Sequence, residues 1–385
     1  MHKHLLTTAL TMTVMLAACT SDDAGTKVTG TTDASLDFTV EVGNTRGASI
    51  DTDGLQQIGR FRVWAWRQAT GGDEEPMISD FNSSPLYGID VTYSPLLQRW
   101  RTAERYYWPS TDYRVDFYAA VPPYDEVFDP NAKSLPDVTV SGNDDIIFAT
   151  YSGQRKKGEL EDVKNVPLEF KHALAQVAFS AKLSSTSPFQ TTFLWTIEVG
   201  QITIHNVKSK GKFTYPKPSD NTQPGGWTPV SPAVYADYTL ASASTGAVTV
   251  SSTTDAVALT SATDVTMLMP QTLTAWIPAW EDATNGTTIA DNNNAAKGSY
   301  LDIQVRIKDH DGNYVLGASD YVHVYTPFAA TWTLNTRYRY TLLFGAGYDA
   351  QGHPIIQTVG IEATIEPWQT DTEQTGTANH TKNTN

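Results

Sequence analysis

The sequence has almost no cysteine and too few basic residues to balance its acidic ones. Cys19 is the only cysteine among 385 residues, so the folded part of the chain has no intramolecular disulfide, no cysteine-based metal site and no thiol nucleophile. The 27 Lys and Arg residues stand against 42 Asp and Glu residues, which gives a formal net charge of −15. Because a nucleic-acid backbone attracts a basic surface, this charge argues against nucleic-acid binding.

The sequence also lacks the motifs that mark most catalytic and metal-binding sites. None of its eight histidines lies in an HExxH or similar metal-ligand pattern, and the chain has neither a GxSxG elbow nor a glycine-rich phosphate loop. His172 lies among apolar residues and is predicted to be a packing histidine. Residues Asp309–Asn313, "DHDGN", lack the spacing and distal glutamate of a calcium loop and are predicted to form a hairpin turn. We therefore expect a protein that is not an enzyme and has no metal or cofactor.

A long apolar run lies at the N-terminus. Leu5–Ala18 follows Lys3 and is too short to span a bilayer, so residues 1–18 are predicted to be a signal peptide. The run ends in "LAAC", which resembles a bacterial lipobox, although an ordinary signal peptide with an incidental cysteine is the alternative. The next residues, "TSDDAG", are similar to the export signal of surface lipoproteins in the Bacteroides group. We expect acylation of Cys19, with residues 19–35 as a flexible tether to the outer membrane.

The rest of the chain has the composition and periodicity of β-sheet. It contains 18 Tyr and 10 Trp residues, and about a dozen short stretches alternate between apolar and polar residues. The first of these is Leu36–Val42. In residues 58–66 apolar side chains occupy both faces, with Trp64 and Trp66 opposite Phe61 and its neighbours, so this strand is predicted either to be buried on both sides or to lie under a loop. Residues 166–183 could be helical, but their alternation favours strand.

These strands, without a convincing helix longer than two turns, predict an all-β sandwich fold. The length suits two sandwiches better than one. The composition shifts at the charged run "SGQRKKGELEDVKN", so the boundary is predicted within about ten residues of 165, with the first domain spanning residues 36–165 and the second residues 166–368. Residues 369–385 are polar and predicted to be disordered.

The tryptophans are the remaining candidates for a binding site. Their aromatic faces suit the apolar faces of glycans, but most lie within strand patterns, where core packing explains them. Trp276 and Trp280, in "TAWIPAWED", flank a proline and border a polar insert, and are the pair with the least core-like setting. We identify them as candidate ligand contacts.

An ordered set of motifs gives the chain its family resemblance. The lipobox, "TRGA", "YYWPSTDYRVDFYAAVPPY", "LEFKHALAQVAF", "ITIHNVKSKGKF", "MLMPQTLTAW" and "TIEPW" together resemble the fimbrillin-like family of Bacteroides-type organisms, the pilins of type V pili. The resemblance implies two transthyretin-like Greek-key β-sandwich domains in tandem, made as a lipoprotein precursor. It also implies that an extracellular trypsin-like, Arg-specific protease cuts after an arginine in the loop behind the first strand. A strand from a neighbouring subunit then fills the vacated groove, and the subunits polymerise head to tail.

Arg46 is the position that matches the cleavage arginine of the family, and Gly47 would become the new N-terminus. Small and polar residues surround it, which suits access by a protease. The alternative is an ordinary loop arginine that is never cut. Arg60 and Arg62 are the nearest competitors, but they lie inside a strand pattern that a protease cannot reach.

The end of the chain departs from the family pattern. A subunit of the pilus shaft also donates a strand, yet the tail after Trp368 is polar and lacks alternation. Residues 359–365 could serve as the donor, or could close the second domain. A subunit that accepts a strand without donating one would be a tip or accessory adhesin, with host or bacterial surface ligands as further partners. The alternative function is a surface glycan-binding lipoprotein of a polysaccharide-uptake system.

Overall fold

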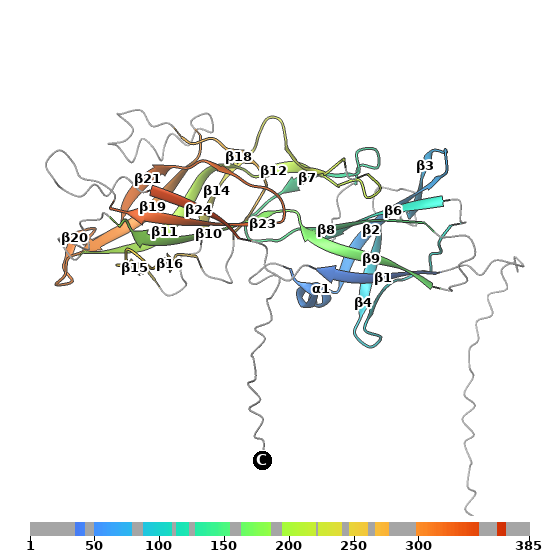
Figure 1. Cartoon of the computed structure of the whole chain (residues 1–385), viewed down its shortest axis with the longest axis horizontal. Helices are drawn as coiled ribbons and strands as arrows, with labels where there is room; N and C mark the ends of the chain where they lie inside the picture. Colours follow the sequence, from blue (N-terminus) through green and yellow to red (C-terminus); the bar gives the residue numbers. More distant parts are fainter. Residues whose placement is uncertain are drawn as a thin grey trace, which may run out of the picture.

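The computed structural model describes residues 35–42, 50–78, 88–109, 113–122, 128–154, 163–185, 195–220, 222–240, 246–260, 266–276, 298–345 and 360–366. These residues form strands β1 to β24 and the short helix α1 (Figure 1), so the predicted all-β fold is confirmed. Figure 1 shows two groups of strands side by side along the long axis, with β1 to β9 mostly on the right and β10 to β24 mostly on the left.

The first group is a sheet of eight strands that closes on itself. Its order is β3 (Glu74–Ile78), β2 (Arg60–Ala69), β4 (Ile89–Ser94), β5 (Arg99–Thr102), β1 (Ser35–Val42), β9 (Val163–His172), β8 (Ile147–Gln154) and β6 (Tyr113–Val121). Because β6 also pairs with β2 over eight residues, the sheet surrounds a core. Phe61, Phe117 and Phe170, each at most 1% exposed, lie at its centre.

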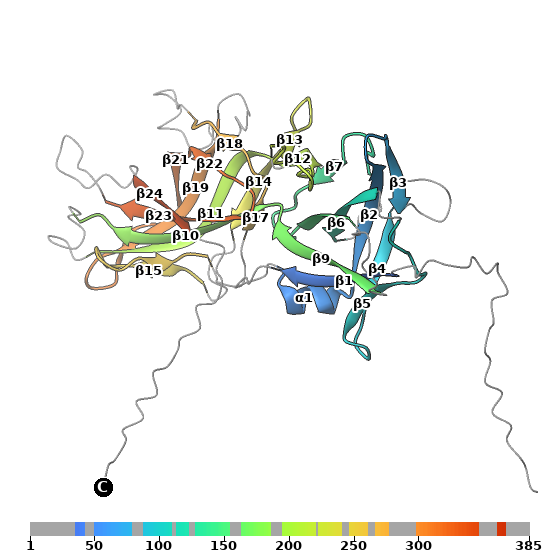
Figure 2. The ribbon, with the colours of Figure 1, turned by 45° about the vertical axis from the view of Figure 1, so that its right-hand side comes forward.

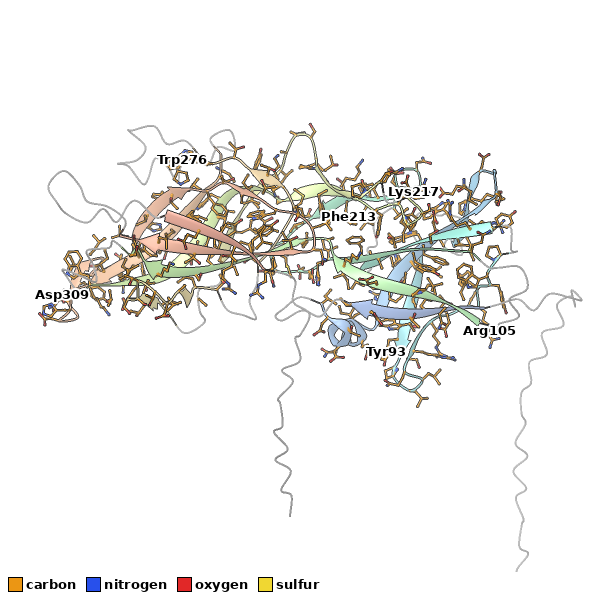
Figure 3. The ribbon with its side chains drawn as sticks, in the orientation of Figure 1. Tyr93, Arg105, Phe213, Lys217, Trp276 and Asp309 are labelled. Carbon is orange, nitrogen blue, oxygen red and sulfur yellow. The ribbon has the colours of Figure 1, made fainter. Side chains whose placement is uncertain are left out.

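Strand β2 is buried on both faces, as its sequence predicts. Phe61, Val63 and Ala65 face the enclosed core, whereas Trp64 and Trp66 face outward into a second cluster. That cluster lies under a three-stranded sheet, whose members are β7 (Ser134–Thr139), β12 (Lys210–Thr214) and β13 (Gly226–Pro229). Strand β7 comes from the first half of the chain and β12 and β13 from the second, so this sheet joins the two halves. Phe213 of β12 lies between the two groups of strands (Figure 3).

The second group is a sandwich of two sheets. One sheet contains β10 (Ala175–Leu183), β16 (Val257–Ala258), β17 (Thr266–Leu268), β23 (Thr336–Phe344) and β24 (Gly360–Glu366). The other contains β11 (Thr196–Lys208), β14 (Tyr235–Leu240), β15 (Val248–Val250), β19 (Tyr300–Lys308), β20 (Tyr314–Leu316) and β21 (Val322–Pro327). A short pair, β18 (Thr272–Leu273) and β22 (Ala330–Thr331), completes the group. Alternate side chains of the two sheets form one core, to which β10, β11, β19 and β23 contribute.

The change from the first group to the second falls between β9 and β10. The segment 166–183 forms strands rather than a helix, as its alternation predicts. Strand β9 runs to His172 and pairs with β1 and β8, so the change of sheets falls after His172, within ten residues of the predicted boundary. The charged run at residues 152–165 stands in the chain from the end of β8 to the start of β9, ahead of the change to the second group.

Two further sequence predictions are confirmed. His172 is 1% exposed, and its Nδ1 lies 2.7 Å from Oδ2 of Asp145. Asp309 lies in the turn that links β19 to β20, where its Oδ1 accepts hydrogen bonds from the backbone amides of Asp311 and Asn313 at 3.0 and 2.8 Å. Figure 3 shows this turn at one end of the molecule.

Candidate assembly groove

The first strand, β1, lies in a groove between β9 and β5. It pairs with β9 in parallel along its whole length, from Ser35↔Val163 to Val42↔Phe170. On its other edge it pairs with β5 at Phe38↔Trp100. Figure 2 shows β1 lying along β9, with α1 below it. Removing β1 would therefore leave unpaired backbone groups on both walls of the groove.

The apolar side chains of β1 fill the floor of this groove. Phe38 and Val42 are 3% and 4% exposed, and Leu36 and Val40 pack half-buried against the same core. The ring of Phe38 lies edge-on to Phe61, with centroids 6.1 Å apart, and edge-on to Phe117 at 6.4 Å. Burial of Phe38 and Val42 alone contributes about 3–6 kcal/mol of hydrophobic stabilisation. The strand is thus part of the core and not merely attached to the surface.

Hydrogen bonds outside the ladder hold both ends of β1. At the start, the amide of Leu36 donates to the carbonyl of Tyr106 at 2.8 Å. At the end, the amide of Val42 donates to Oγ1 of Thr52 at 3.2 Å. Thr52 opens α1 (Thr52–Ile58), whose N-cap is Asp51. Its C-cap, Gly59, adopts φ of 75°, which favours glycine. The capping residues Asp51 and Gly59 can be recognised in the sequence. The helix itself cannot, because seven residues are too few to show an apolar periodicity.

The predicted processing residues fall on both sides of β1. Cys19, Arg46 and Gly47 lie outside the described residues. The chain is described again from Ile50, whose amide donates to Oδ2 of Asp145 at 2.9 Å. The competing arginines are both in β2, where the guanidinium of Arg62 pairs with Asp90 at 2.9 Å and that of Arg60 with the same residue at 3.6 Å. Their backbone is paired with β4 and, at Arg62, also with β6, so its hydrogen-bonding groups are already occupied and are not available to a protease.

The last strand, β24, is an edge strand with an exposed apolar row. Ile361, Ala363 and Ile365 stand opposite Leu342, Tyr340 and Tyr338 of β23, so they lie on the face of the sheet that carries the core. Yet only Ile361 packs against that core, and Ile365 is 69% exposed. A strand with alternating apolar residues that its own core does not fully bury has the pattern of a strand that can pair with another chain.

Of the two predicted tryptophan contacts, the structure describes Trp276. Trp276 is 4% exposed, and its ring lies 5.3 Å from that of Tyr300. Figure 3 places it on the upper side of the second group of strands. Trp280 lies outside the described residues. The ring of Trp276 is therefore packed, and a glycan contact through it stays a prediction without support from its position.

The described residues show no grouping of three or more His, Asp or Glu side chains that could hold a metal ion. In the same part of the chain, none of the helical segments has the length and apolarity that a membrane span requires. The largest pKa shifts among the described residues belong to buried tyrosines. Burial raises the pKa of Tyr238 to about 12, and burial likewise raises the pKa of Tyr340 to about 12.

Comparison with known proteins gives a match over most of the chain. The model of the fimbrillin-like family matches residues 60–368. The chain belongs to the fimbrillin-like family. This membership confirms the resemblance found in the sequence and indicates a structural subunit at the cell surface, which assembles with other pilin subunits. The match begins at the first residue of β2, so β1 lies outside it.

A search of solved structures found proteins that are similar to this fimbrillin-like chain. A fimbrial protein from Bacteroides vulgatus is 14% identical with a TM-score of 0.52, and the alignment covers 87% of this chain and 99% of that one. A candidate cell adhesion protein from Parabacteroides distasonis is 10% identical with a TM-score of 0.46, over 88% of this chain and 99% of that one. A search of curated proteins gave no match.

Proposed function

We propose that this protein is the lipid-anchored precursor of a fimbrial subunit, and that it polymerises by donor-strand exchange once a trypsin-like protease cuts after Arg46. The observation that carries the proposal is the position of β1. It fills the core with Phe38 and Val42, and it lies between the predicted lipid anchor at Cys19 and the predicted cleavage loop. A single cut after Arg46 therefore separates both β1 and the outer-membrane anchor from the remaining chain.

Strand exchange follows from the groove that β1 occupies. Without β1, the backbone of β9 from Val163 to Phe170 loses its partner, and the core around Phe61 and Phe117 opens to water. A strand from a neighbouring subunit that carries alternating apolar residues restores both the ladder and the core. Because the donor and the groove lie on different parts of the chain, the contact is heterologous and builds a filament rather than a closed ring.

The exposed apolar row of β24 supports this strand as the donor. Its residues Ile361, Ala363 and Ile365 have the spacing that a β1-like groove accepts. A tip or accessory adhesin would accept a strand but keep its own β24 paired with β23. A shaft subunit would instead release β24 to a neighbouring subunit. The second candidate function, a surface glycan-binding lipoprotein, rests on Trp276 and Trp280, and the burial of Trp276 gives it no support.

Limited proteolysis tests the proposal. Trypsin should cut the folded precursor first after Arg46 and leave a resistant fragment that begins at Gly47, which N-terminal sequencing identifies. Arg46→Ala should remove this cut and leave monomers in electron micrographs, whereas Arg60→Ala, within paired β2, should behave as the wild type. A first cut elsewhere, or filaments from Arg46→Ala cells that contain the protein unchanged, would refute the proposal.

A further inference from the structure

The hairpin of β4 and β5 ends in two exposed leucines. Leu96 is 92% exposed and Leu97 is 45% exposed, and both lie in the loop between Ser94 and Arg99, which pair across the hairpin. Figures 1 and 2 both show this hairpin extending below the other strands. Single exposed apolar residues are common on protein surfaces, so the importance of these leucines depends on the loop and the charges that accompany them.

Hydrogen bonds hold the loop in one conformation. The amide of Leu97 donates to the carbonyl of Ser94 at 3.1 Å. The side chain of Gln98 accepts a hydrogen bond from the hydroxyl of Tyr93 at 2.9 Å and donates one to the carbonyl of Pro95 at 2.6 Å. Figure 3 places Tyr93 on the lower side of the first group of strands. The leucines are thus presented on a pre-ordered loop, which loses little conformational entropy when it binds.

Three arginines accompany this tip. Arg99 and Arg101 lie on the same exposed face of β5, and Arg105 is exposed in the segment that follows the strand. Residues 91–109 contain these three arginines and one acid, Glu104, so their net charge is +2 in a chain whose net charge is −15. None of the ion pairs within the described part of the chain engages these arginines. Their charges are therefore available to anionic groups.

The described chain begins beside these arginines. Strand β1 pairs with β5, and the amide of Leu36 donates to the carbonyl of Tyr106, which directly follows Arg105, at 2.8 Å. The predicted lipid anchor, Cys19, precedes the first described residue by sixteen positions, over which a chain reaches at most about 55 Å. The anchor of the proposed function thus keeps this side of the protein close to the bilayer.

We propose that the β4–β5 hairpin binds an anionic lipid surface, with its two leucines in the acyl-chain interface and its three arginines on lipid phosphates. An apolar tip accompanied by basic residues matches a bilayer surface, in which anionic headgroups cover the acyl chains. A fluid bilayer accepts a convex tip of two side chains, whereas a folded partner needs a pocket of matching shape. The place of the contact rests on the proposed function, because the anchor brings the hairpin to the membrane. The contact then orients the precursor on that membrane.

Binding to vesicles tests this contact. The mature chain is made from Thr20 onward, so that it carries no acyl group. Its sedimentation is measured with vesicles of phosphatidylglycerol and phosphatidylcholine in equal parts, and with vesicles of phosphatidylcholine alone. We expect binding to the anionic vesicles that weakens as salt is raised. Leu96→Ser combined with Leu97→Ser should weaken it about 30-fold or more. Arg99→Gln combined with Arg101→Gln should weaken it about 25-fold, since an arginine near an anionic surface contributes about fivefold.

Two control variants carry the same kinds of change elsewhere. Val315 is 47% exposed in β20, and Lys217 is exposed on the upper side of Figure 3, away from the hairpin. Val315→Ser and Lys217→Gln should each leave vesicle binding within about twofold of the wild type. Circular dichroism of every variant shows that the fold is kept.

A single label shows whether the tip itself enters the bilayer. The chain from Thr20 onward contains no cysteine, because Cys19 is the only one. Leu96→Cys therefore places an environment-sensitive dye at the tip alone. The emission of this dye should shift to shorter wavelength on addition of the anionic vesicles, whereas the same dye on Val315→Cys should not respond.

Three results would overturn the inference: no binding by the wild type, hairpin variants that bind as the wild type does, or a dye at the tip that does not respond. If the hairpin variants instead abolish self-association in the absence of vesicles, the hairpin binds protein and the lipid contact is wrong. An uncut Arg46 or an unacylated Cys19 refutes the proposed function, but leaves the vesicle result of the unacylated chain unchanged.

Discussion

The replacement Phe38→Ala examines whether β1 is a core strand that can be exchanged. Phe38 is 3% exposed and contacts the rings of Phe61 and Phe117 edge-on. Truncating a buried phenylalanine to alanine costs about 3–5 kcal/mol, because apolar area returns to water and a cavity remains. We expect about 3 kcal/mol here, at the lower end, since Phe38 lies in the first described strand and pairs with β5 at one position only.

The same loss of free energy should weaken the binding of β1 to the remaining chain after cleavage. After cleavage at Arg46, β1 is bound to the remaining chain only by non-covalent contacts, so a loss of 3 kcal/mol corresponds to more than 100-fold weaker retention. The free energy of unfolding is measured by urea titration of the uncut chain, and retention by size-exclusion chromatography of the trypsin-cut chain. Thr39→Ala, at the exposed neighbouring position, is the matched control and should change stability by less than about 0.5 kcal/mol.

The outcome decides between two views of β1. If Phe38→Ala costs less than about 1 kcal/mol, or if the cut strand is retained as well as in the wild type, β1 adds little to the core. A neighbouring subunit would then have nothing to replace, and the donor-strand proposal would lose its physical basis even with Arg46 cleaved.

Two further predictions concern the donor strand and alkaline stability. Thr341→Cys with Glu362→Cys, a directly opposed pair on β23 and β24, should form a disulfide that blocks polymerisation of processed subunits until it is reduced; filaments that form with the disulfide intact would exclude β24 as the donor. The pKa values of Tyr238 and Tyr340 are raised to about 12 in the folded chain against an ordinary value of about 10. Because the unfolded chain releases these protons first, their stabilisation is complete below pH 10 and is lost as pH rises toward about 12. Circular dichroism and tyrosinate absorbance should therefore change together in that range, and ionisation of both tyrosines near pH 10 without unfolding would contradict it.

Local patterns in the sequence predict much of the fold correctly. The alternation of Leu36, Phe38, Val40 and Val42 predicts β1 to within one residue, because a strand with one buried face must alternate. The aromatic residues on both sides of β2 predict a strand covered on both faces, as Trp64 and Phe61 confirm. His172 and the Asp309 turn also follow from their local surroundings.

Other features depend on which segments meet, and no local pattern encodes that. Strand β7 pairs with β12, 71 to 80 positions further along the chain, so strands from both halves of the chain share one sheet. Asp145 looks like any turn residue in the sequence. Its contacts with Ile50 and His172 arise only when the ends of three distant segments converge, so no motif could have identified it.

The sequence by itself determined that the chain is all-β, that β1 alternates toward a core, and that an arginine among small residues follows it along the chain. Periodicity and composition suffice for these points, since they reflect which side chains leave water. Only the tertiary structure decided that β9 and β5 form the walls around β1, that β24 keeps an exposed apolar row, and that Asp145 contacts both Ile50 and His172. Strand partners and buried polar contacts are set by residues far apart in the chain, and pairing of this kind exists only once the whole fold has formed.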